Sequence, residues 1–174
     1  MCASSCSEPN SMISGIDRRR FGLLVGASLL VPFGARASEI AALALTCIDY
    51  RLVGAGVRLL DGMGMEKNYD QVALAGASLA AVSDKFPTSN AAFWNHVDIA
   101  RKLHNVRKLV VVDHRDCGAY KVAFGKDYAP NPPEEDAQHK AVMEQVKAQL
   151  AVKHPDLPSE YYLMALDGTA KRLL

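Results

Sequence analysis

Residues 108–118 read KLVVVDHRDCG, and this stretch decides the fold class. Its aliphatic, β-branched centre at residues 109–112 predicts a buried strand over residues 108–113. Because the run is apolar on both faces, we expect helices to cover both sides of its sheet. The chemistry changes abruptly after the strand, where His114 and Cys117 introduce two side chains that can bind metals.

Working outward, further apolar runs alternate with segments of helical periodicity. Strands are predicted over residues 40–48, 71–75, 108–113 and 161–166. Helices are predicted over residues 52–60, 91–104 and 134–152, with proline-containing loops at 86–90 and 129–133. Strands that alternate with helices indicate an α/β fold, a mostly parallel β-sheet flanked by helices.

Length and composition limit the possible functions. The chain has 174 residues, enough for one domain with a substantial core. The formal charge of +1 provides no basic face for nucleic acid. No segment is apolar over 18 residues, so we expect no permanent membrane span.

The N-terminal segment has the organisation of a signal peptide. Three arginines at 18–20 precede an apolar run at 21–34, and Ala-Arg-Ala follows at 35–37. Paired arginines before x-Phe-x-Leu resemble the twin-arginine export signal. We therefore expect residues 1–37 to be removed on export to a bacterial periplasm, leaving a domain at 38–174. The alternative is an N-terminal amphipathic helix packed on the domain.

Removal of that signal would leave Cys47 and Cys117 as the remaining cysteines. In an exported protein such a pair can form one disulfide, or it can bind a metal. Cys47 ends the first predicted strand, while His114 and Cys117 follow the third. The carboxyl ends of parallel strands meet at one edge of the sheet, so the three side chains can converge there. Two thiolates and an imidazole suit zinc, and three protein ligands leave its fourth position open, as in catalytic sites.

Two short motifs make the comparison with a known family specific. Residues 47–51, CIDYR, match the C-x-D-x-R motif of the β-class carbonic anhydrases, and residues 114–118, HRDCG, match their H-x-x-C-G motif. The motifs occur in the family's order and on the expected strands. The sequence therefore resembles a divergent, exported member of this family.

The resemblance implies a site and a reaction. Cys47, His114 and Cys117 would bind one zinc ion per subunit, and a zinc-bound hydroxide would hydrate carbon dioxide reversibly to bicarbonate. Asp49 and Arg51 would be the catalytic pair, in which Asp49 accepts a hydrogen bond from the hydroxide and Arg51 keeps Asp49 ionised and in place. The resemblance further implies a homodimer or higher homo-oligomer with active sites at the subunit interface. The backbone N–H of Gly118 would face the substrate.

One segment departs from the family. Residues 73–78 read ALAGAS, where the family usually carries an R-N-A-G-N-like sequence. The polar positions have become apolar in a loop that normally shapes the site. Two alternatives therefore stand beside carbon dioxide hydration: hydrolysis of carbonyl sulfide or carbon disulfide at the same site, and a non-catalytic zinc-binding protein of the same fold.

Overall fold

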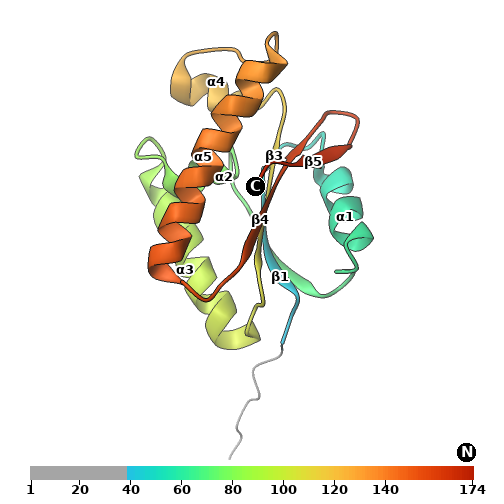
Figure 1. The fold of residues 1–174 in the computed structure, drawn as a ribbon, viewed down its shortest axis with the longest axis vertical. Helices are drawn as coiled ribbons and strands as arrows, with labels where there is room; N and C mark the ends of the chain where they lie inside the picture. Colours follow the sequence, from blue (N-terminus) through green and yellow to red (C-terminus); the bar gives the residue numbers. More distant parts are fainter. Residues whose placement is uncertain (1–38) are drawn as a thin grey trace, which may run out of the picture. The chain divides into compact units, whose positions relative to one another are not determined.

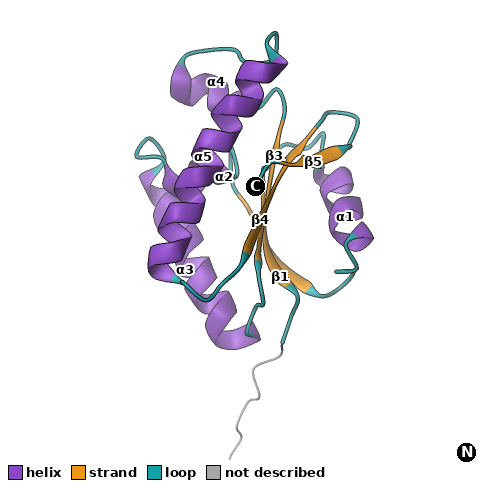
Figure 2. Ribbon diagram, in the orientation of Figure 1, coloured by secondary structure: helices purple, strands orange, loops and turns teal. Residues whose placement is uncertain are grey.

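The computed structural model describes residues 39–174, and the predicted signal at residues 1–37 lies outside them. In the described part of the chain, no helix is long and apolar enough to cross a membrane. One five-stranded sheet organises the domain, in the order β2-β1-β3-β4-β5. The strands are β1 Ala42–Thr46, β2 Tyr69–Ala73, β3 Leu109–His114, β4 Ser159–Met164 and β5 Ala170–Arg172. The first four are parallel and β5 is antiparallel to β4, which confirms the predicted fold class (Figures 1 and 2).

Helices cover both faces of this sheet (Figure 2). They are α1 Val53–Gly62, α2 Ser78–Val82, α3 Pro87–His104, α4 Gly118–Phe124 and α5 Pro132–Lys153. The alternation of side chains along β1 assigns the faces: Ala42 and Ala44 pack with α1, whereas Leu43 and Leu45 face the core formed with α2, α3 and α5. Since β1 and β3 lie at the centre of the sheet, their carboxyl ends are adjacent.

Two predicted loops are wrong at their proline-containing ends. Helix α3 begins at Pro87 rather than after Asn90, and α5 begins at Pro132 rather than at Glu134. Proline has a backbone φ suited to the first helical turn, where its missing N–H would have had no intrahelical acceptor. The side chain of Asn131 then accepts the N–H of Glu134 and caps α5.

Three short elements were not predicted: α2, α4 and β5. Each has seven residues or fewer, too short to show a hydrophobic period. A turn at Asp167-Gly168 leads into β5, and in this turn the N–H of Gly168 donates to the carbonyl oxygen of Ala165. Two of these elements matter for the site, because α2 follows the altered loop and α4 begins directly after Cys117.

Candidate metal centre

The structure brings together the three residues that the sequence singled out as ligands. Cys47 follows β1, His114 is the last residue of β3, and Cys117 precedes α4. Their two sulfurs and an imidazole nitrogen all lie within 4.8 Å of one another. His114 and Cys117 are buried and Cys47 is half-buried, so the cluster opens to one side only. A metal ion placed among these atoms would be held by protein on the buried side.

The imidazole of His114 is oriented for metal binding. Its Nδ1 lies 2.8 Å from the carbonyl oxygen of Arg115, which can only accept, so Nδ1 carries the proton. The other nitrogen, Nε2, is buried and has no hydrogen-bond partner among residues 39–174. A buried acceptor without a partner is costly unless something binds it. Two sulfurs and this free imidazole nitrogen are the donor set that zinc prefers, so the residues present fit the ion.

The two cysteines are distinct in their surroundings. Neither forms a disulfide, so the disulfide alternative does not hold in the part of the chain that the structure describes. The adjacent Cys117 thiol, with His114 and the N–H of Gly76 3.3 Å away, lowers the pKa of Cys47 to about 4, against the opposing effect of burial. The same Cys47 thiolate, together with burial, raises the pKa of Cys117. Cys47 therefore provides a preformed thiolate, and a cation among these atoms would favour deprotonation of Cys117 as well.

Asp49 and Arg51 form a two-pronged ion pair beside the ligands. Arg51 donates from Nε to Oδ1 at 3.0 Å and from its terminal nitrogen to Oδ2 at 2.7 Å. This pairing lowers the pKa of Asp49 to about 2, so its carboxylate is ionised at neutral pH. Oδ2 lies 3.8 Å from Nε2 of His114, which places the charge next to the ligand cluster. Arg51 also contacts Asp116, at 2.9 Å to the side chain and 3.1 Å to the carbonyl oxygen.

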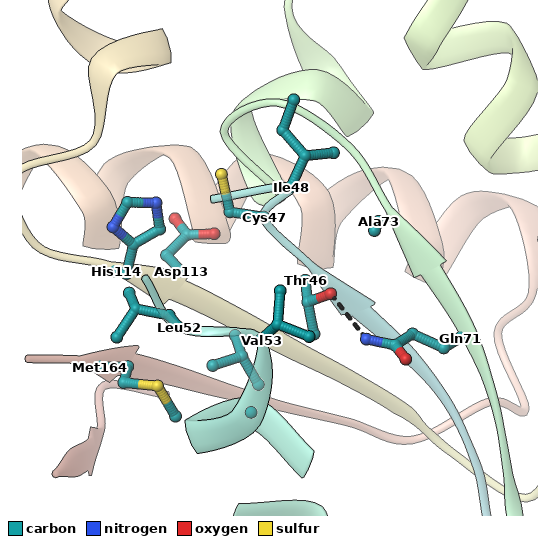
Figure 3. A pocket seen from close by; sticks show the side chains of 12 residues that line it. Thr46, Cys47, Ile48, Leu52, Val53, Gln71, Ala73, Asp113, His114 and Met164 are labelled. Carbon is teal, nitrogen blue, oxygen red and sulfur yellow. Dashed lines mark hydrogen bonds between the residues drawn. The ribbon is translucent and has the colours of Figure 1, made fainter. Parts of the chain in front are cut away.

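A cavity of about 370 Å³ reaches this cluster (Figure 3). Cys47 and His114 form part of its wall, and the remainder is mostly apolar. Apart from these two, its lining is Thr46, Ile48, Leu52, Val53, Gly56, Gln71, Ala73, Val112, Asp113 and Met164. In Figure 3, the side chain of Gln71 extends toward Thr46 and donates a hydrogen bond to its hydroxyl at 3.0 Å. The site is therefore accessible to a small molecule through a largely apolar cavity.

Comparison with known proteins now identifies the family. A family profile described as "Putative carbonic anhydrase" matches residues 37–155. The chain belongs to this family. An uncharacterized protein of Rickettsia conorii is 34% identical over 136 residues, covering 78% of this chain and 73% of that protein. A second, from Rickettsia bellii, is 30% identical and covers 78% of this chain and 83% of that protein.

The solved structures agree on the fold. A carbonic anhydrase from Glaciozyma antarctica superimposes with a TM-score of 0.52, covering 80% of this chain and 85% of that chain. The sequence identity is 13%, so the likeness concerns the fold alone. The suspected relationship to β-class carbonic anhydrases is thus confirmed at the level of family and fold.

The loop at residues 73–78 has a backbone role in this family member. Gly76 has φ of +83°, and a Cβ added there would lie 3.0 Å from the Cβ of Ala119. Glycine is therefore required both by conformation and by close packing. This geometry points the Gly76 N–H at the sulfur of Cys47. Through this backbone N–H, the loop contacts the sulfur of a predicted metal ligand.

Gly118, predicted to bind substrate, begins α4 and is not among the residues lining the cavity that the structure describes. A Cβ at this position would meet nothing within 4 Å, so no close approach requires glycine here. The role of its N–H stays a prediction. It differs in this respect from Gly76, where the structure itself excludes a side chain.

A buried polar cluster behind the ligands was missed from the sequence. The carboxylate of Asp113 accepts hydrogen bonds from Ser78, Tyr120 and His139, all of them buried. Burial and the Asp113 charge raise the pKa of Tyr120 well above its usual range, which keeps its hydroxyl a donor. The cluster joins α2, α4 and α5 to the strand residue that precedes His114. The sequence signal that could have indicated this cluster is Asp113, an acidic residue that follows the apolar run at 109–112.

Proposed function

We propose that this protein binds one zinc ion through Cys47, His114 and Cys117 and catalyses the reversible hydration of carbon dioxide to bicarbonate. The observation that carries the proposal is the unpartnered Nε2 of His114, which lies with two sulfurs beside an ionised Asp49. Zinc, when bound, supplies a Lewis acid that lowers the pKa of water toward 7. Family membership supports the same reaction class.

The chain's own residues would orient the reactants. Asp49 is ionised and can only accept hydrogen bonds, so it would accept one from the attacking water or hydroxide and direct its lone pair. Arg51 acts through Asp49: its two donated hydrogen bonds fix the carboxylate plane and keep it from protonation. Arg51 is therefore a positioning residue, and Asp49 is the residue that would touch the reacting atoms.

The lining of the cavity supports a second candidate reaction. Ile48, Val53 and Met164 offer no hydrogen bonds from their side chains, and Ala73 replaces a polar family position. Carbonyl sulfide and carbon disulfide are linear and less polar than bicarbonate, so an apolar cavity would accept them. Hydrolysis of these heterocumulenes is the alternative activity of the same site.

The deciding experiment measures zinc content and stopped-flow carbon dioxide hydration on the mature protein, beside Asp49→Asn and Cys47→Ser. We expect about one zinc per chain, retained in Asp49→Asn with hydration reduced by at least ~100-fold, and lost in Cys47→Ser. Asp61→Asn, on an exposed position of α1, is the matched control and should hydrate like wild type. A zinc-loaded wild type without hydration, yet active on carbonyl sulfide, would replace the proposal by the alternative. Zinc without either activity would favour a non-catalytic binding protein.

Two further proposals concern the environment of the protein. We propose twin-arginine export of the chain to the periplasm, supported by the sequence order at residues 18–37. Cell fractionation with Arg18–Arg20 changed to lysine tests this, since retention in the cytoplasm is expected for the variant and periplasmic recovery for wild type.

We also propose a homodimer, supported by the exposed apolar side chains of Ile48 and Tyr50 beside the site, which are 61% and 86% exposed. Sedimentation of a Tyr50→Asp variant tests this, because a monomer is expected only if that face is the interface.

A further inference from the structure

Glu135 is a buried carboxylate with no role in the proposed chemistry. It lies in the first turn of α5 and is 2% exposed. Both of its oxygens contact the short loop between His114 and Cys117. Oε2 pairs with a terminal nitrogen of Arg115 at 2.7 Å, and Oε1 accepts the backbone N–H of Asp116 at 2.7 Å.

This arrangement is energetically demanding. Removing a carboxylate from water costs several kcal/mol, and an apolar residue of similar size usually stabilises a helix packing face equally well. The N-terminal position on α5 and the two contacts offset that cost. The cap of α5 does not depend on Glu135, because Asn131 caps it through the neighbouring residue Glu134. The carboxylate therefore serves the loop rather than the helix.

The loop needs such support because its backbone is strained. Asp116 has φ of +54°, in the left-handed region that a non-glycine residue adopts at a cost of about 1–2 kcal/mol. Its amide hydrogen points inward to Glu135. Arg51 and Lys121 hold the side chain of Asp116, but its amide hydrogen is held by Glu135, and without that acceptor the left-handed conformation would leave this donor unpaired.

Both flanking ligands depend on the conformation of this loop. The carbonyl oxygen of Arg115 receives Nδ1–H of His114, and Asp116 directly precedes Cys117. Asp116 also accepts Arg51 on its side chain and on its carbonyl oxygen. A change in the peptide at 115–116 would thus move an imidazole, a thiolate and the partner of Asp49 together.

We propose that Glu135 is a positioning residue that holds the 115–117 loop in its metal-binding conformation. The inference rests on the zinc site of the proposed function, but not on its reaction. Through Glu135, α5 would orient the two ligands His114, at the end of β3, and Cys117, directly before α4. Residues supporting metal ligands in this way typically contribute about 10–100-fold to metal affinity.

The test compares Glu135→Ala, Glu135→Gln and Glu134→Gln on the mature protein. Zinc affinity is measured by competition with a chromophoric chelator, ligand geometry by the visible absorption of the Co²⁺-substituted protein, and folding by thermal unfolding of the metal-free form. Glu134 is the matched control, since it is adjacent, its side chain is 41% exposed, and within the described part of the chain that side chain pairs only with Lys126 and Asn131.

We expect Glu135→Ala to weaken zinc binding by about 10–100-fold and to alter the Co²⁺ spectrum. Glu135→Gln keeps an acceptor for the Asp116 N–H and should recover most of that loss, whereas Glu134→Gln should bind within twofold of wild type. If Glu135→Ala does not fold, Glu135→Gln provides the test. Its zinc affinity is then expected to be about threefold or more below that of wild type, because the charged pairing with Arg115 is lost.

Two outcomes would overturn the inference, and they differ in what else they overturn. Wild-type zinc affinity and an unchanged Co²⁺ spectrum in the Glu135 variants, with lower thermal stability alone, would show that the residue only supports folding. Absence of zinc binding by the wild type would instead remove the proposed function and this inference with it.

Discussion

Removing the hydroxyl of Tyr120 tests the buried cluster behind the metal centre. In Tyr120→Phe, Asp113 loses one donor at 2.8 Å but keeps those from Ser78 and His139. A hydrogen bond to a buried charged group contributes about 1.5–3 kcal/mol, and the ring's apolar contacts are unchanged. For a domain of this size, that corresponds to a melting temperature lower by roughly 5–10 °C.

The chain offers a matched control in Tyr161→Phe. The hydroxyl of Tyr161 is also buried but has no hydrogen-bond partner in the residues that the structure describes, so its removal should be neutral or stabilising by up to about 1 kcal/mol. Urea unfolding of the metal-free proteins at pH 7 gives both values. Tyr120→Phe within about 0.5 kcal/mol of wild type, or Tyr161→Phe equally destabilised, would refute the assignment of a stabilising charged network around Asp113.

Three shorter predictions concern the ligands, the loop and acid stability. Cys117→Ser should lower the zinc content from about one per chain to near zero after dialysis, by metal analysis; unchanged content would exclude this ligand. Gly76→Ala should lower the free energy of unfolding by about 1–3 kcal/mol more than Gly64→Ala does. Both glycines have positive φ, but of the two only Gly76 is enclosed by neighbouring side chains. Equal losses in the two variants would contradict this. Asp49 and Asp156 have folded-state pKa values of about 2, below the ordinary 3.8, so their stabilisation is present above pH 4 and is lost as pH falls toward 2. The urea midpoint of unfolding should drop between pH 4 and pH 2, and it should drop less in Asp156→Asn. A urea midpoint that does not change over this pH range would contradict the prediction.

The parts of the fold predicted from the sequence are those in which one physical signal dominates. The apolar run at 109–112 is buried on both faces as expected, since a central strand of a sheet that helices cover on both faces buries successive side chains. Cys47 and His114 lie together because parallel neighbouring strands end at one edge. Their convergence follows from topology and needs no knowledge of side-chain packing.

The rest depends on contacts between distant residues. Pro87 and Pro132 each begin a helix, although both were predicted to lie in loops. Whether a proline begins a helix or lies in a loop depends on the conformation of the residues before it. In the sequence, Glu135 is an ordinary acidic residue in a first helical turn. Its role depends on residues 115 and 116, which are distant in the sequence: Arg115 pairs with its carboxylate, and the left-handed Asp116 donates its N–H to it. His139 is buried in the core, where the carboxylate of Asp113 accepts a hydrogen bond from its ring.

We propose that zinc binds at the point where two sulfurs and Nε2 of His114 converge. X-ray diffraction from zinc-loaded crystals, recorded at the zinc absorption edge, locates the ion. We expect one anomalous peak per chain, about 2.3 Å from the sulfurs of Cys47 and Cys117 and about 2.0–2.1 Å from Nε2 of His114, with a fourth position not filled by these three residues. A peak elsewhere, or a sulfur–sulfur bond in place of the ion, would contradict it.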